Sequence, residues 1–172
     1  MDATKSYVKI YNISPETAED FESDYDTNSH DLLTEMAPRI EEWDNVGWME
    51  VDYYEYNLPD NMMHLTLSTK SASPIEWLRR SSVNVSYLDN KLIVMSTIQQ
   101  DETCVTGVAL MDGQILQNKP IFEMEPEEVG KYYDDDEPAY ELDELDDRIW
   151  NSISKFVNIC EQFYLEGEKE NG

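Results

Sequence analysis

Basic residues are scarce in this sequence. It contains 12 Lys and Arg residues against 38 Asp and Glu residues, which gives a formal net charge of −26 and an isoelectric point near 4.1. Such a field repels nucleic acids and anionic membranes and attracts basic proteins, and added salt screens the attraction. The composition therefore argues against direct binding to nucleic acid or membrane, and it favours a basic protein as the partner.

Cysteine and long apolar runs are scarce as well. Cys104 and Cys160 lie far apart and form no C-x-x-C pair, so neither a disulfide framework nor a zinc site is expected. No run approaches the ~18 apolar residues of a membrane span, and the first residues lack the unbroken apolar region of a signal peptide. The sequence predicts a cytoplasmic protein.

Recognisable catalytic and metal-binding motifs are missing. There is no G-x-S-x-G, no Walker phosphate loop and no H-E-x-x-H, and only His30 and His64 offer imidazole bases. His30 is expected to cap a helix, and His64 to face solvent because its strand neighbours point the other way. The acidic run at 134–137 lacks the ligand spacing of an EF-hand loop. We expect no enzyme activity, no catalytic residues, no cofactor and no metal site.

Patterns of apolar residues predict the secondary structure. Strands are predicted at 6–13, 49–56, 62–69, 83–88, 91–98, 104–111 and 114–117. Helices are predicted at 16–26, 30–43, 74–81 and 142–166, and Ser-Pro pairs at Ser14 and Ser73 open two of them. Residues 119–147 show no clear period and are expected to form an acidic surface segment. All four tryptophans are assigned to the core: Trp43, Trp48, Trp77 and Trp150.

The order of these elements predicts an α+β fold. The hydrophobic fraction of 40% over 172 residues is enough for one core, so 1–172 is predicted to be a single domain. The expected architecture is a ferredoxin-like split βαβ core at 5–118 with a largely antiparallel sheet, extra hairpin strands and a C-terminal amphipathic helix at 142–166.

Four short stretches resemble a known family. They are "NVGW" (45–48), "LTLSTK" (65–70), "SPIEWL" (73–78) and "TGVALMDGQI" (106–115). Over about residues 5–118 the chain resembles the YubB-like ferredoxin-fold domains of plasmid and phage proteins. The resemblance implies the fold and a mobile-element origin, and it brings no established catalytic residues. A phage-encoded protein would act in the cytoplasm of the host cell.

Carboxylates crowd Lys131–Asp147, where nine of 17 residues are acidic and one is basic. The helix dipole favours acids in a first helical turn, which accounts for Asp143 and Glu144 but not for the acids upstream. If Glu141–Asp147 is helical, its acids place about one charge per ~2 Å, close to the ~1.7 Å of duplex DNA. Tyrosine among carboxylates suits recognition of arginine and lysine. The predicted partner-binding residues are Glu125, Glu127, Glu128, Tyr132, Tyr133, Asp134, Asp135, Asp136, Glu137, Glu141, Asp143, Glu144, Asp146 and Asp147.

These features predict a non-enzymatic acidic inhibitor that imitates nucleic acid. Its partner would be a basic nucleic-acid-binding protein of the host, such as a restriction or CRISPR defence protein, and it would act by competition. The alternative is a general interaction or regulatory module that uses the sheet or the aromatic strand at 51–56, with the acidity serving only solubility. The salt dependence of binding separates the two. The sequence leaves homo-oligomerisation open.

Overall fold

The computed structural model of the chain describes residues 4–19, 49–70, 72–84, 88–99, 104–125 and 142–166. It has an α+β fold with a six-stranded antiparallel sheet and a C-terminal helix. The elements are β1 (Thr4–Ile10), β2 (Met49–Asn57), β3 (Met62–Thr69), α4 (Ile75–Asn84), β4 (Ile93–Ile98), β5 (Cys104–Met111), β6 (Gln114–Glu123), α6 (Leu142–Cys160) and η2 (Glu161–Glu166). The segment η2 continues α6 as a π-helical turn.

The strands follow the order β2-β3-β1-β4-β5-β6, so the first strand lies in the middle of the sheet. Both predicted hairpins form. β2 pairs with β3 around the turn at 58–61, and β5 pairs with β6 around Asp112 and Gly113. Asp112 and Gly113 have φ angles of 51° and 78°, as the tight hairpin turns that favour an Asp-Gly pair require.

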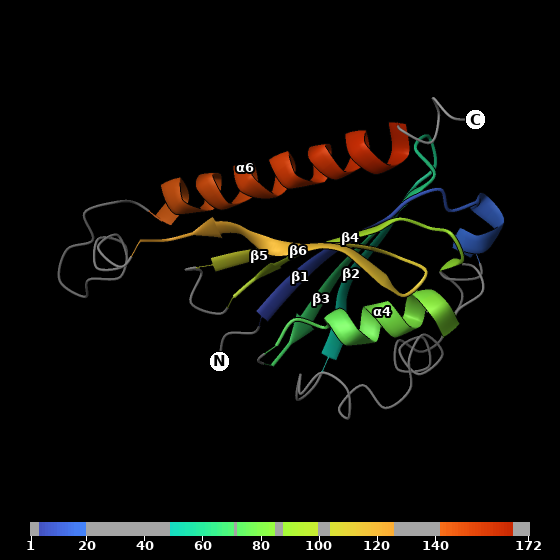
Figure 1. Cartoon of the computed structure of the whole chain (residues 1–172), viewed down its shortest axis with the longest axis horizontal. Coiled ribbons are helices and arrows are strands. Elements are labelled where there is room, and N and C mark those ends of the chain that lie inside the picture. The colour runs from blue at the N-terminus through green and yellow to red at the C-terminus, as the bar shows by residue number, and fades with distance from the viewer. Residues whose placement is uncertain are drawn as a thin grey trace.

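Helices cover both faces of the sheet. Figure 1 shows α6 along one face and α4 against the other. Because side chains alternate along a strand, β1 sends Val8 and Ile10 into the core beneath α4, where Trp77 is fully buried. The opposite core joins the apolar side of α6 to β4, β5 and β6, through residues that include Leu145, Ile149, Ile153, Phe156, Val157 and Cys160.

The helix predicted after β1 begins as expected. Residues 15–19 are helical, and the Ser14 hydroxyl accepts a hydrogen bond from the Thr17 amide at 3.2 Å, which is the N-cap contact. Ala18 joins the core on the α4 side. The rest of that predicted helix, the predicted helix at 30–43 and the "NVGW" stretch lie outside the described residues.

Two predicted boundaries are wrong. The segment 83–88 is predicted to be a strand, but α4 extends to Asn84 and Leu88 is in a 3₁₀-helical conformation, while 85–87 are outside the described residues. The hydroxyl of Ser81 donates to the Trp77 carbonyl within α4, so helix contacts outweigh the β propensity of this segment. Residues 119–123 belong to β6, although no strand was predicted there. Pairing with β5 extends this edge strand despite Pro120, which edge positions tolerate.

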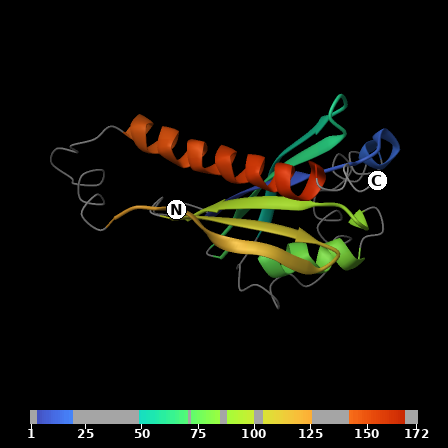
Figure 2. The same cartoon turned by 45° about the horizontal axis from the view of Figure 1, so that its top comes forward.

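The helix α6 covers only part of its face of the sheet. Its main contacts are with β4, β5 and β6, and Figure 2 shows β2 and β3 extending beyond it. The approach to β5 is close because Gly107 has no side chain. A Cβ built on Gly107 would lie 2.7 Å from the Phe156 ring, nearer than two carbon atoms can pack. This contact fixes the height of α6 above the sheet.

We expect Gly107→Ala to destabilise the protein by about 1–3 kcal/mol, because the added methyl group overpacks the contact with Phe156. Urea unfolding measures the loss. The matched control is Gly107→Ala combined with Phe156→Leu, which makes room for the methyl group. The double variant should lose less stability than the sum of the two single variants. Additive losses would show that the two residues are not coupled.

Candidate functional site

The structure places five of the predicted partner-binding residues within its described part. Glu125 is exposed two residues after the end of β6, and Glu144, Asp146 and Asp147 are exposed on the first turns of α6. The backbone of Asp143 is helical. The other predicted residues lie outside the described part: Glu127, Glu128, Tyr132, Tyr133, Asp134, Asp135, Asp136, Glu137 and Glu141.

The first turns of α6 are acidic outside and apolar inside. Leu145 and Ile149 are buried against the sheet, and the neighbouring Glu144, Asp146 and Asp147 are exposed. At a rise of ~1.5 Å per residue, these three carboxylates occupy about 4.5 Å of helix axis. None of them forms an ion pair with another described residue. This acidic turn, Glu144 to Asp147, therefore presents three closely spaced charges that no described residue neutralises.

The net charge is unevenly divided along the sequence. The described residues contain 17 of the 38 Asp and Glu residues and 9 of the 12 Lys and Arg residues. Most of the excess negative charge is therefore carried by the remaining 62 residues. Elsewhere in the described part, exposed acids are more widely spaced, as at Asp60, Asp89 and Asp112 in turns and at Asp52, Glu55 and Glu123 on strands. The acidic turn is the densest group among them.

A second feature is the part of the sheet face that α6 leaves uncovered, on β1, β2 and β3. Polar side chains form rows across these strands. In the first row, Lys5 lies opposite Ser68, and its ammonium group donates to Asp52 Oδ2 at 2.8 Å and to Ser68 Oγ at 2.5 Å. Ser68 in turn donates to Asp52. The polar groups of this row therefore bond to one another.

The next two rows contain tyrosines, hydroxyl groups and a histidine. Strand pairing aligns Tyr53, Thr66, Tyr7 and Ser96 across β2, β3, β1 and β4, and it aligns Glu55, His64, Lys9 and Val94 in the row beside them. Because cross-strand neighbours have Cβ atoms about 5 Å apart, each row forms a continuous line of side chains. These two rows line the floor of a pocket.

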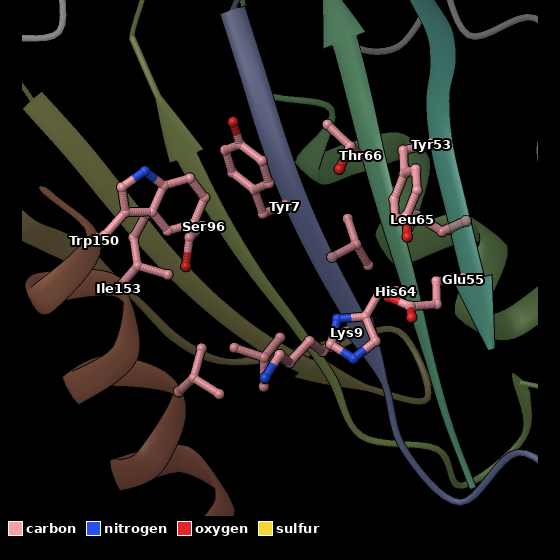
Figure 3. A pocket seen from close by; sticks show the side chains of 13 residues that line it. Tyr7, Lys9, Tyr53, Glu55, His64, Leu65, Thr66, Ser96, Trp150 and Ile153 are labelled. Carbon is pink, nitrogen blue, oxygen red and sulfur yellow. The ribbon is translucent and has the colours of Figure 1, made fainter. Parts of the chain in front are cut away.

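The helix α6 supplies the wall of this pocket. Trp150, Ile153 and Val157 stand beside the rows, and the pocket encloses about 170 Å³. The Trp150 ring meets the Tyr7 ring edge-on, with centroids 4.7 Å apart and planes at 67°. Figure 3 shows Trp150, Ile153 and Ser96 on one side of the pocket and Tyr53, Glu55 and His64 on the other.

Burial and neighbouring charges shift the pKa values of two residues in the pocket. The pKa of His64 is lowered from its ordinary value, first by burial and then by the ammonium group of Lys9. The pKa of Tyr53 is raised, chiefly by the carboxylate of Glu55. A histidine with a lowered pKa is neutral at pH 7. Lys9 and Glu55 are therefore the charged side chains among the lining residues at that pH.

One tryptophan assignment is wrong. Because Trp150 was assigned to the core, its position in the lining of a pocket was not predicted. Trp150 was expected in the core, but its side chain is 43% exposed, whereas Trp77 is buried as predicted. Trp43 and Trp48 lie outside the described residues. The buried stripe of α6 runs through Ile149 and Ile153, and Trp150 is displaced ~100° from Ile149 around the helix. This offset was a usable signal, as was the alternation of Lys5, Tyr7 and Lys9 with buried residues.

Other classes of site are not evident in the described part of the chain. It holds no group of three or more His, Cys, Asp or Glu side chains placed to bind a metal ion. None of its helices is long and apolar enough to cross a membrane.

No family model, curated protein or solved structure matches this chain. The functional argument therefore depends on the acidic turn, the polar rows and the pocket.

We expect Lys9→Met to raise the pKa of His64, because it removes the ammonium group that opposes protonation. NMR titration of the imidazole Cε1 proton measures this, with His30→Gln used to assign the two signals. A lowered pKa in the folded state reduces the free energy of unfolding as the pH falls below about 6.5. The variant should therefore lose less unfolding free energy between pH 8 and pH 5 than the parent does. Lys5→Met is the control and should leave the pKa of His64 unchanged, since Asp52 neutralises Lys5. Equal shifts in both variants would contradict the assignment.

Proposed function

We propose that this protein is a non-enzymatic acidic inhibitor, encoded by a phage or another mobile element, that imitates nucleic acid. It occupies the basic groove of a DNA- or RNA-binding protein of the host, such as a restriction or CRISPR defence protein. The observation that carries the proposal is the net charge of −26 combined with exposed carboxylates at 144, 146 and 147 that have no counter-ions among the described residues.

The arrangement of the sheet supports the proposed origin. The order β4-β1-β3-β2, with residues 15–19 and α4 contributing to one core on the same face, is compatible with a ferredoxin-like split βαβ core. Such a core is what the resemblance of residues 5–118 to YubB-like domains of plasmids and phages implies. The strands β5 and β6 and the helix α6 would then be additions to that core.

Competition with nucleic acid follows from charge and rigidity. A protein that grips phosphates with lysine and arginine meets carboxylates at a similar spacing on the acidic turn, and it gains charge-assisted hydrogen bonds from them. The long-range field raises the rate of encounter. Because Leu145 and Ile149 hold this turn against the sheet, little ordering entropy is lost there on binding. The predicted site extends to the other acidic residues and tyrosines of 125–147.

A general interaction module that uses the sheet is the second candidate. It is favoured by the exposed aromatic side chain of Tyr53, which is 51% accessible on β2, and by the part of the face that α6 leaves uncovered. An apolar and aromatic contact of this kind depends little on ionic strength, whereas pairing between opposite charges weakens steeply with salt.

We expect the immobilised protein to capture nucleic-acid-binding proteins from a bacterial lysate, and to release them both with increasing salt and with short duplex DNA. Mass spectrometry of the eluted fractions measures the enrichment. Release by DNA at constant ionic strength is the sharper criterion, because it requires the DNA and the acidic protein to share one groove. If the captured proteins show no enrichment in nucleic-acid binders, or if DNA does not displace them, the proposal is wrong.

Neutralising the acidic turn should weaken binding to a captured partner by about tenfold, since three paired carboxylates contribute about 0.5 kcal/mol each. The variant is Glu144→Gln, Asp146→Asn and Asp147→Asn together, measured by calorimetry at 0.15 M salt. The control is Glu16→Gln, Glu19→Gln and Asp60→Asn, which changes the net charge by the same amount at other exposed positions. Equal losses in the two variants would mean that the overall field, and not the acidic turn, accounts for binding.

A further inference from the structure

The pocket beside α6 collects polar groups that have no partner within the described part of the chain. The hydroxyl oxygen of Ser96 is buried and unbonded, and the residue is 1% exposed. The ammonium group of Lys9 and the hydroxyl of Thr66 form no hydrogen bond or ion pair with any described residue. Buried hydroxyls in native proteins are nearly always bonded, so an unbonded one that lines a pocket points to a ligand.

The neighbouring row provides an internal comparison. Lys5 and Lys9 lie on the same strand and the same face, and each has a strand neighbour with a polar side chain. Lys5 is held by Asp52 and Ser68, whereas Lys9 is not held by any described group. The sheet can therefore neutralise a lysine at this face, and it does so at one row and not at the other.

The walls and the size of the pocket limit what it can hold. Val94, Ile153 and Val157 give it an apolar side, and Trp150 and Tyr7 give it an aromatic edge. Its volume of about 170 Å³ is below the ~300–1,000 Å³ typical of sites for drug-sized ligands. It therefore suits a branched aliphatic group or a single ring.

The charged groups decide the sign of the ligand. Figure 3 shows the Lys9 side chain running toward α6, the side on which Trp150 and Ile153 lie, while Glu55 stands on the opposite side with His64. The apolar part of the pocket is thus next to a cation. Among the described lining residues, the donors are one ammonium group, hydroxyls, the His64 imidazole and the Trp150 indole, and none is an arginine. Such a set suits a carboxylate better than a phosphate, which is more often held by several donors that include arginine or backbone amides.

We propose that the pocket between α6 and strands β1, β3 and β4 binds a small carboxylate with an apolar or single-ring body. Lys9 and Ser96 hold the carboxylate oxygens, and Trp150 and Ile153 pack against the body. This site is separate from the acidic turn and does not depend on the proposed nucleic-acid imitation. The carboxylate belongs either to a free small acid or to the C-terminus of a peptide that ends in an apolar residue.

The test uses the full chain and defined probes in a buffer without carboxylates. We expect 3-methylbutanoate and benzoate to shift the amide signals of Lys9 and Ser96 and the indole signal of Trp150 in ¹H–¹⁵N spectra, with dissociation constants on the order of 1 mM. Benzamide and benzyl alcohol, which have the ring without the charge, should bind at least about tenfold more weakly. Equal binding of benzamide and benzoate would overturn the proposal, as would an absence of shifts with either acid.

Matched variants separate binding from folding. Lys9→Met should weaken benzoate binding about tenfold or more, and Lys5→Met should leave it unchanged within about twofold. Ser96→Ala should weaken binding while leaving urea stability equal or higher, because it removes an unbonded buried hydroxyl. A loss of stability in Ser96→Ala, or equal binding losses in the two lysine variants, would contradict the assigned roles.

A comparison of three further ligands identifies the source of the carboxylate. N-acetyl-glycyl-valine is compared with its C-terminal amide and with 3-methylbutanoate. Tighter binding of the dipeptide acid than of both others supports a peptide C-terminus, and tighter binding of 3-methylbutanoate supports a free acid. If the dipeptide amide binds as well as the dipeptide acid, the carboxylate is not recognised and the proposal fails.

Discussion

The close approach of α6 to β5 at Gly107 determines which part of the sheet stays available. With no side chain at Gly107, the Phe156 ring rests directly on the strand, and the buried side of α6 packs on β4, β5 and β6. The helix cannot also cover β1, β3 and β2, because a single helix is only about 10 Å wide with its side chains and sheet strands are spaced at ~4.8 Å. The pocket forms along the line where its coverage ends.

Two opposite electrostatic environments meet on α6. Its outer side carries Glu144, Asp146 and Asp147, and its Val157 lines the same pocket as Lys9. At physiological ionic strength charges are screened over ~8 Å, so the large negative charge of the chain governs the approach of a partner, while the nearest groups govern what a small pocket holds. An acidic protein can therefore attract basic surfaces at long range and still offer a cationic group to a small anion at short range.

Much of the fold was predictable because local signals agree with the tertiary contacts. The hairpins at 58–61 and 112–113, the N-cap at Ser14 and the terminal helix all follow from turn and capping chemistry that acts within a few residues. The errors arose where distant contacts decide the structure. The strand β6 extends to Glu123 because β5 pairs with it, and α4 extends to Asn84 against the β propensity of valine.

The candidate site was only partly predictable for the same reason. Carboxylate crowding at 141–147 is visible in the sequence, so the acidic turn could be named in advance. The pocket could not, because Tyr7, His64, Ser96 and Trp150 come from four separate elements and are brought together by strand register and by the offset of α6. The sequence shows that His64 points away from the core, because its strand neighbours Met63 and Leu65 are apolar. It does not show which strands lie beside His64.

The acidic turn is held in place by packing, because repulsion among its own carboxylates destabilises the helical arrangement. Three adjacent carboxylates repel one another, and the dipole at the helix N-terminus offsets only part of this, about 0.3–1 kcal/mol for each acid near the end. Leu145 and Ile149 are 0% and 2% exposed, and burying such side chains contributes about 1.5–3 kcal/mol each. Burial of these two residues therefore outweighs the repulsion, and it keeps the carboxylates at the spacing of the helix. An acidic segment without such anchors would have to be ordered by its partner, at a cost in affinity.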